Sequence, residues 1–222
     1  MDLWDETCGF CAEIRNLEQD NNLLHSHITP ATGLHSRVLY ETAHFQVIPT
    51  LGAFVEGYVM VVSKDHYDCV GKLPPEQIAE LEQIVEEMKG RIRRRYGTAA
   101  VCFEHGSVSC TNRFGGCINH AHLHIVPCRE NLVDQVRQYD LELSPITTLD
   151  ALAQYGRDGR PYLYFQDADG ARFLITGLCI VSQFFRMLLA RHHAVGECWD
   201  WRKHLYLENI GKTIDALKDP QT

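Results

Sequence analysis

Three histidines at alternate positions form the most informative motif of the sequence. They are His120, His122 and His124, within the segment Asn119-His-Ala-His-Leu-His-Ile-Val-Pro127. On a β-strand, alternate side chains point to the same face, so the pattern predicts three imidazoles on one face of a sheet. One interpretation is that the three histidines occur by chance or bind metal adventitiously at the surface. The other is that they form a functional face, because imidazole nitrogens need partners. Such a face would hold a metal, an anion or hydrogen-bonding groups.

Two cysteines separated by two residues, Cys8 and Cys11, form a second chemical motif. This spacing lets both thiolates reach one tetrahedral zinc ion. The alternative is redox chemistry, which usually places such a pair between a strand and a helix of a thioredoxin-like unit. The surrounding sequence lacks that pattern, which favours structural zinc. His66 and His120 are the candidates for the two further ligands.

The elements that must position these residues are short strands and one long helix. Strands are predicted at 37–41, 45–49, 57–64, 99–104 and 120–127. A helix is predicted to open at Pro74-Pro75-Glu76, because prolines and acidic residues suit a first turn and apolar residues follow at helical spacing. The polar, turn-rich segment 16–36 predicts a long irregular connection.

The pattern changes after Pro127. A hairpin is predicted from 162–166 and 172–176, followed by helices at 179–193 and 205–218. This order predicts an α+β protein with two parts, a domain at 1–130 and an α+β extension at 131–222 that packs on it.

Composition restricts the class of protein. The chain has 222 residues, of which 45% are hydrophobic and 23% charged, as in soluble globular proteins. The net charge of −8 argues against a broad nucleic-acid surface. The acidic N-terminus does not resemble a signal peptide, and no stretch predicts a membrane span. Nine cysteines without a secretory signal argue against a disulfide framework and for a cytoplasmic protein.

Together, these motifs resemble the histidine-triad superfamily, whose motif alternates histidine with apolar residues as the segment around His122 does. The resemblance covers about residues 8–128 and includes the strand 57–64 with its Lys64-Asp-His66 turn. The Cys-x-x-Cys pair resembles that of zinc-containing members and of galactose-1-phosphate uridylyltransferase. The resemblance implies a histidine-triad α+β fold, an antiparallel sheet with a long helix against it, here followed by a C-terminal extension of a hairpin and helices.

The resemblance also implies roles for individual residues. His122 matches the nucleophile that attacks an α-phosphorus and forms a nucleotidyl-histidine, and His124 matches the residue that bonds phosphate oxygen. Four protein ligands would close the zinc site, so the zinc is expected to be structural, without a bound water. The expected zinc ligands are Cys8, Cys11, His66 and His120.

The implied activity is hydrolysis of a nucleoside phosphoanhydride, phosphoramidate or ester, because hydrolytic branches carry histidine at the third triad position. One alternative is a nucleotidyltransferase or phosphorylase that uses a second acceptor. An alternative of another class is a zinc-stabilised nucleotide-binding protein with little turnover. The expected partner is a small nucleotide, not a nucleic acid or a membrane, and relatives of this kind are often homodimers.

Departures from the family's pattern concern how a substrate is held. Many members have an aspartate for the ribose where this chain has Thr50, and the approach to the triad reads Gly115-Gly-Cys-Ile-Asn119. Gln183 and Arg186 share a face of the predicted helix 179–193 and are within reach of a substrate in this interpretation. The other candidates for substrate contact are Thr50, Glu104, His105, Gly116 and Asn119.

Overall fold

A single antiparallel sheet organises the fold. The computed structural model describes residues 3–106, 118–176 and 183–218. In this part of the chain, the strands form one sheet of eight in the order β1-β2-β3-β5-β4-β7-β8-β6, and all neighbours are antiparallel. The strands are β1 Tyr40–Glu41, β2 Phe45–Pro49, β3 Val59–Ser63, β4 Ala100–Gly106, β5 His122–Pro127, β6 Ser144–Ile146, β7 Tyr162–Gln166 and β8 Arg172–Ile175.

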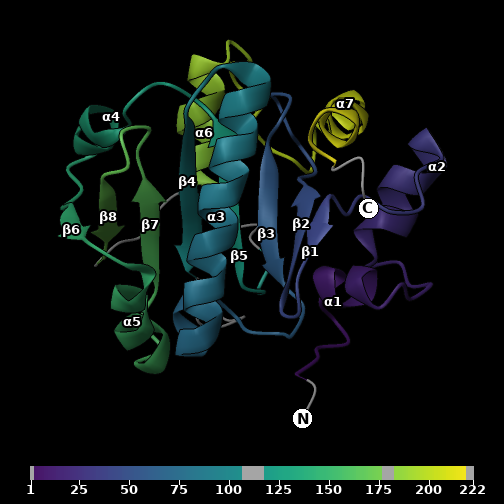
Figure 1. The fold of residues 1–222 in the computed structure, drawn as a ribbon, viewed down its shortest axis with the longest axis horizontal. Coiled ribbons are helices and arrows are strands. Elements are labelled where there is room, and N and C mark those ends of the chain that lie inside the picture. The colour runs from purple at the N-terminus through teal and green to yellow at the C-terminus, as the bar shows by residue number, and fades with distance from the viewer. Residues whose placement is uncertain (1–2, 107–117, 177–182, 219–222) are drawn as a thin grey trace.

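Helices cover both faces of this sheet (Figure 1). The α-helices are α1 Gly9–Ile14, α2 Thr29–Thr32, α3 Pro75–Tyr96, α4 Val133–Arg137, α5 Ala153–Arg157, α6 Phe184–His192 and α7 Leu207–Leu217. Short helical turns are η1 Leu24–Ile28, η2 Val70–Lys72 and η3 Leu149–Leu152. The predicted α+β class, an antiparallel sheet with a long helix and a C-terminal hairpin with helices, is therefore confirmed.

The long helix α3 covers the front face of the sheet in Figure 1. Its apolar residues recur at helical spacing, and Leu81, Met88 and Ile92 are buried in one cluster with Leu123 and Ile125 of β5. The helix begins directly after Pro74, as predicted, and ends at Gly97, which adopts a left-handed conformation. This packing fixes β5 from one side.

The opposite face of the sheet is covered by α6. Phe184, Phe185 and Leu188 of this helix are buried against Phe103 of β4 and Val126 of β5. Because side chains alternate along a strand, His124 shares this face with Val126, while Leu123 and Ile125 face α3. The second and third histidines of the motif are thus presented between the sheet and the C-terminal segment.

The C-terminal segment supplies strands to the same sheet. Strand β7 pairs with β4 over five residues, from Cys102↔Gln166 to Gly106↔Tyr162. The hairpin β7–β8 confirms the strands predicted at 162–166 and 172–176. The domain boundary predicted at residue 130 stays a prediction. Backbone hydrogen bonds between β4 and β7 join the segment before this boundary to the segment after it.

The structure differs from the sequence predictions in a few short segments. Strand β1 has only two residues, and the connection 16–36 contains the short helical segments η1 and α2 rather than being irregular. Residues 179–182 of a predicted helix lie outside the described residues, and α6 begins at Phe184. No helix in the described part of the chain is long and apolar enough to cross a bilayer.

Candidate active site and metal centre

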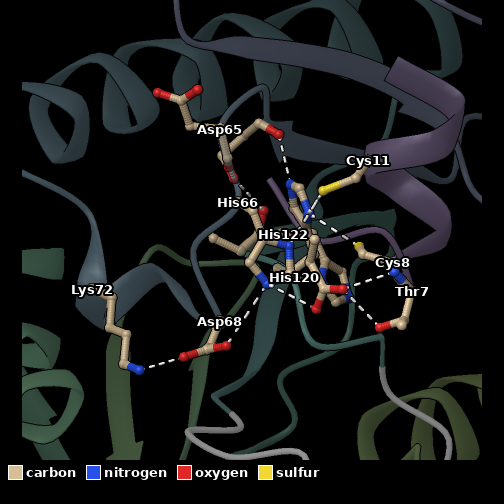
Figure 2. Close-up of polar contacts among 12 residues, drawn as sticks. Thr7, Cys8, Cys11, Asp65, His66, Asp68, Lys72, His120 and His122 are labelled. Carbon is tan, nitrogen blue, oxygen red and sulfur yellow. Dashed lines mark hydrogen bonds and ion pairs between the residues drawn. The ribbon is translucent and has the colours of Figure 1, made fainter. Parts of the chain in front are cut away.

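Four side chains from three separate segments meet in a metal-binding cluster. Cys8 precedes α1 and Cys11 lies within it, His66 follows β3, and His120 precedes β5. Nδ1 of His120 lies 3.4 Å from Sγ of Cys8 and 3.7 Å from Sγ of Cys11, and Nδ1 of His66 lies 3.3 Å from Sγ of Cys11. Figure 2 shows both rings beside the two sulfurs.

These distances fit a tetrahedral zinc site. With Zn–S of about 2.3 Å and Zn–N of about 2.0–2.1 Å, neighbouring sulfur and nitrogen ligands lie about 3.6 Å apart. The four ligand atoms lie within 4.8 Å of one another, and three of the four residues are buried. A Cys2His2 set leaves no position for water, so Cys8, Cys11, His66 and His120 fit a structural zinc ion.

Polar groups lie next to the far nitrogen of each histidine. Nε2 of His120 donates to the backbone oxygen of Ser63 over 2.7 Å, which leaves the Nδ1 lone pair directed at the sulfurs. Nε2 of His66 lies 3.8 Å from a carboxylate oxygen of Asp5 and 3.8 Å from one of Asp68. Carboxylates or carbonyls on the far nitrogen fix the ring orientation of metal-binding histidines.

The two thiols differ in proton affinity. Hydrogen bonding from Cys8, with further bonds from His120 and His66, lowers the pKa of Cys11 well below the usual thiol value. The same thiol–thiolate bond, together with burial, raises the pKa of Cys8. Since zinc binds thiolates, loading of the site releases the proton that Cys8 retains.

His122 lies beside this cluster and is 8% exposed. Its Nδ1 lies 2.6 Å from the backbone oxygen of His120. A carbonyl only accepts, so Nδ1 carries the proton and Nε2 carries the lone pair in the neutral ring. Burial lowers the pKa of His122 to about 4, which keeps the ring neutral near pH 7. The ring therefore has the tautomer and charge of a nucleophilic imidazole.

His124 is held by an aromatic ring and a phenol. Its ring stacks on Phe103 with centroids 4.4 Å apart, and its Nδ1 lies 3.0 Å from the hydroxyl of Tyr58. Burial, followed by the charges of His122 and Arg186, lowers the pKa of His124 well below its ordinary value. A neutral His124 at this position can donate or accept a single hydrogen bond toward a ligand.

A cavity joins these two histidines to groups from distant segments. It is lined by His122, His124 and His105, by apolar side chains of Phe10, Leu23, Leu51, Met60, Ile118 and Trp201, and by Arg37, Thr50, Gln183 and Arg186. Burial also lowers the pKa of His105, to about 3. The cavity thus combines neutral imidazoles, apolar walls and two arginines, a combination suited to an organic anion.

The structure brings together only some of the predicted substrate residues. Thr50 and His105 line the cavity. Asn119 is half-buried next to the cluster but is not among the lining residues, and Gly116 lies outside the described residues. Strand β5 begins at His122 rather than at residue 120, and the His120 ring belongs to the metal cluster, as predicted.

Glu104 is not among the lining residues of the cavity, and its predicted contact with substrate stays a prediction. Its carboxylate accepts hydrogen bonds from the backbone N–H of Val70 over 2.6 Å and from the Tyr162 hydroxyl over 2.8 Å. Neighbouring residues of a strand point to opposite faces, so Glu104 faces α3 when His105 faces the cavity. Burial raises the pKa of Glu104 to about 8.

Tyr58, which contacts His124, and Arg37, which lines the cavity, were not predicted from the sequence. A usable signal existed for Tyr58, because Tyr58, Met60 and Val62 alternate before and along β3, and the last two pair with His124 and His122. Arg37 is buried far from any recognised motif, and its position depends on its pairing with Glu13. The predicted placement of Gln183 and Arg186 at the cavity agrees with the structure.

Residues 31–131 match the family model of the HIT domain, so this stretch of the chain is a HIT domain. The metal cluster uses Cys8 and Cys11, which precede the matched stretch, and the cavity uses residues that follow it. No curated protein sequence matches the chain.

Similar solved structures include several HIT proteins. A hypothetical histidine triad nucleotide-binding protein from Sulfolobus tokodaii is 21% identical, with 55% of this chain and 70% of that chain covered and a TM-score of 0.41. A Zn-bound histidine triad family protein from Mycobacterium smegmatis is 20% identical, with 68% and 97% covered and a TM-score of 0.40. A HIT family hydrolase from Clostridium thermocellum is 17% identical, with 56% and 93% covered and a TM-score of 0.38. The HIT assignment rests on the matched residues and the site rather than on these superpositions.

Proposed function

We propose that the protein is a nucleotide hydrolase that cleaves at the α-phosphorus of a nucleoside phosphoanhydride, phosphoramidate or ester. His122 is the nucleophile, and a nucleotidyl group is carried transiently on its Nε2. HIT domains commonly belong to hydrolases or transferases that act on nucleotides, which supports the reaction class. The finer assignment depends on the arrangement of this chain's own residues.

The observation that carries the proposal is the contact between His122 and the His120 carbonyl. The 2.6 Å bond uses the Nδ1 proton, so the lone pair of the neutral ring lies on Nε2. The pKa of about 4 means that no proton must first be removed near pH 7. A neutral imidazole is a good nucleophile, and an imidazole bonded to phosphorus is a good leaving group.

The reaction then proceeds in two displacements. In the first, the Nε2 lone pair attacks the α-phosphorus, a P–N bond forms, and the leaving group departs with the electrons of its bond and takes a proton from solvent. In the second, water attacks the same phosphorus, releases a proton, and the P–N electrons return to His122. The products are a nucleoside monophosphate, the leaving group and the original enzyme.

His124 is assigned to the phosphoryl oxygens. It lies next to His122, with ring centroids 5.0 Å apart, and is fixed by the Phe103 stack and the Tyr58 hydroxyl. A hydrogen bond from a fixed neutral group stabilises charge that develops on phosphoryl oxygen. Zinc bound by the four cluster residues would hold His120, and through it the carbonyl that orients His122, without taking part in the chemistry.

Intact-protein mass spectrometry tests this proposal. The protein is mixed with a panel of nucleoside phosphoanhydrides and phosphoramidates and quenched without acid, since a phosphorus–nitrogen bond is acid-labile. We expect a mass increase of one nucleotidyl group, located on His122 by peptide mapping. His122→Gly should show no adduct and at least hundreds-fold lower turnover, because the covalent route is removed.

The control and the outcomes separate the alternatives. His25→Gly removes a half-buried histidine that lies away from the lining of the cavity, and it should keep both adduct and turnover. Adduct that persists until a second substrate is added would indicate a transferase. Full turnover by His122→Gly would overturn the nucleophile assignment, and nucleotide binding without turnover would indicate a binding protein.

A further inference from the structure

Only two arginines are fully buried in the described part of the chain, and they differ in how their charge is balanced. Arg37 is 1% exposed and Arg186 is 3% exposed. Arg37 donates to both carboxylate oxygens of Glu13, over 2.6 Å and 2.7 Å. Among the described residues, no carboxylate lies within ion-pairing distance of Arg186. Both arginines line the same cavity, so their surroundings can be compared within one site.

The neighbours of Arg186 are neutral. Its Nε donates to the backbone oxygen of Trp199 over 3.1 Å, one Nη donates to the Tyr58 hydroxyl over 3.1 Å, and the other donates to the backbone oxygen of Gly52 over 2.5 Å. The guanidinium also lies 5.3 Å from the ring centroid of Phe54. A guanidinium has five N–H donors, so these acceptors engage three and leave two for another acceptor.

A buried charge without a counter-charge is costly. The effective penalty for burying an ion is several kcal/mol, and neutral acceptors offset only part of it. The other groups of the cavity do not supply the missing negative charge, because no carboxylate of the described residues lines it and Glu13 is engaged by Arg37. The positive charge of Arg186 contributes to the lowered pKa of His124 and His105, two histidines that line the same cavity.

We propose that Arg186 binds the anionic phosphoryl group of the substrate beside His122, so that the C-terminal segment completes the active site. The inference rests on the proposed function for the location of the reacting phosphate. Arg186 belongs to α6, which lies beyond the HIT domain at 31–131. Arginine suits this role because its planar donors match phosphate oxygens in pairs. The ligand class is a phosphoanhydride, phosphoramidate or phosphate ester with at least one negative charge on its phosphoryl oxygens.

The competing explanation is that Arg186 only clamps α6 onto the loop at Gly52. The two roles predict different effects of substitution. Loss of Arg186 should weaken the affinity for anions only if its side chain binds phosphate. We therefore measure binding of inorganic phosphate by isothermal titration calorimetry at constant ionic strength. The proteins are the wild type, Arg186→Gln, and the control Arg191→Gln, which removes the same charge from an exposed position of the same helix.

We expect the wild type to bind one phosphate and Arg186→Gln to bind it at least tenfold more weakly. Arg191→Gln should stay within twofold of the wild type. A folded Arg186→Gln protein with wild-type phosphate affinity would overturn the proposal, as would a wild type that does not bind phosphate. The Arg186→Lys variant keeps the charge but not the paired donors, so its affinity should lie between those of the wild type and Arg186→Gln.

A measurement on the wild type covers the case in which Arg186→Gln does not fold. Phosphate titration of ¹⁵N-labelled protein should shift the Nε–H resonance of Arg186, assigned by its loss from the spectrum of Arg186→Lys. A resonance that does not move at saturating phosphate would overturn the proposal. Neither test depends on turnover, so the two proposals can fail separately. If phosphate binds through Arg186 but no adduct forms on His122, the proposed chemistry is refuted and the role of Arg186 is retained.

Discussion

The backbone oxygen of His120 lies 2.6 Å from Nδ1 of His122, while the ring of the same His120 lies 3.4 Å from the sulfur of Cys8. One residue therefore joins the metal cluster to the proposed nucleophile: its ring belongs to the cluster, and its carbonyl accepts the hydrogen bond from His122. The link is short and made through backbone, so displacement of the His120 ring must also displace the acceptor that selects the His122 tautomer.

Removal of a zinc ligand should therefore affect stability first and activity second. Cys8→Ala is expected to lose stoichiometric zinc and to melt at a clearly lower temperature, because the free energy of metal binding contributes to folding. Elemental analysis and thermal denaturation measure both effects. Cys198→Ala, a half-buried cysteine outside the cluster, is the control and should keep its zinc. Wild-type protein purified without chelators that contains no stoichiometric metal would contradict the assignment.

The third histidine of the motif is expected to control the second displacement. His124→Gln keeps a hydrogen-bonding side chain beside His122 but changes how water and phosphoryl oxygen are held. We predict that hydrolysis of the nucleotidyl-histidine slows more than its formation, so that adduct accumulates in quenched time courses. Formation and hydrolysis that slow in parallel would show that this position does not direct water to the intermediate.

Glu104 should make stability depend on pH. Its pKa is raised from 4.5 to about 8 by burial, so between these values the folded state binds more protons than the unfolded state. Stability must then decrease as pH rises through this window, because the unfolded state binds fewer protons. Glu104→Gln should flatten that decrease, measured by denaturant unfolding from about pH 5 to about pH 9. Glu142→Gln, which changes an exposed carboxylate, should reproduce the wild-type slope.

Substitution of Gly52 by alanine tests the contact between the HIT domain and α6. Its φ is +73°, and a Cβ would lie 2.5 Å from Nη2 of Arg186 and 2.5 Å from Cβ of Trp201. Gly33 also has φ +73°, but a Cβ there would meet nothing within 4 Å. Gly33→Ala therefore measures the cost of the left-handed backbone conformation alone, about 1–2 kcal/mol. Gly52→Ala should cost more by about 1–3 kcal/mol in chemical denaturation, because overpacking is added. Equal losses in both variants would show that the loop adjusts freely.

Much of the fold could be predicted because strong periodic patterns agreed with local signals. The helix from Pro75 and the strand Phe45–Pro49 combine clear hydrophobic spacing with clear ends, and the structure has them where they were predicted. The zinc cluster was also predictable, since Cys8 and Cys11 have a ligand spacing that few other roles require. Short segments such as β6 and α4 have too few residues for a periodic signal and were not predicted.

The cavity was less predictable because its residues are joined by tertiary structure alone. Arg37, Met60 and Trp201 line it but lie far apart in the sequence and share no motif. Glu104 is adjacent to His105 in the sequence but faces α3, because neighbouring residues of a strand point to opposite faces. Strand β5 begins at His122, two residues later than the alternating pattern predicts.

The pairing of β4 with β7 has a consequence for how copies of this chain can associate. A strand at the edge of a sheet offers unpaired N–H and C=O groups to other chains. Here the outer edge of β4 is occupied from Cys102 to Gly106 by the chain's own β7. A second copy cannot extend the sheet at that strand, so a homodimer must use other surfaces. A shortened protein ending near residue 130 would expose this edge and become prone to edge-to-edge aggregation.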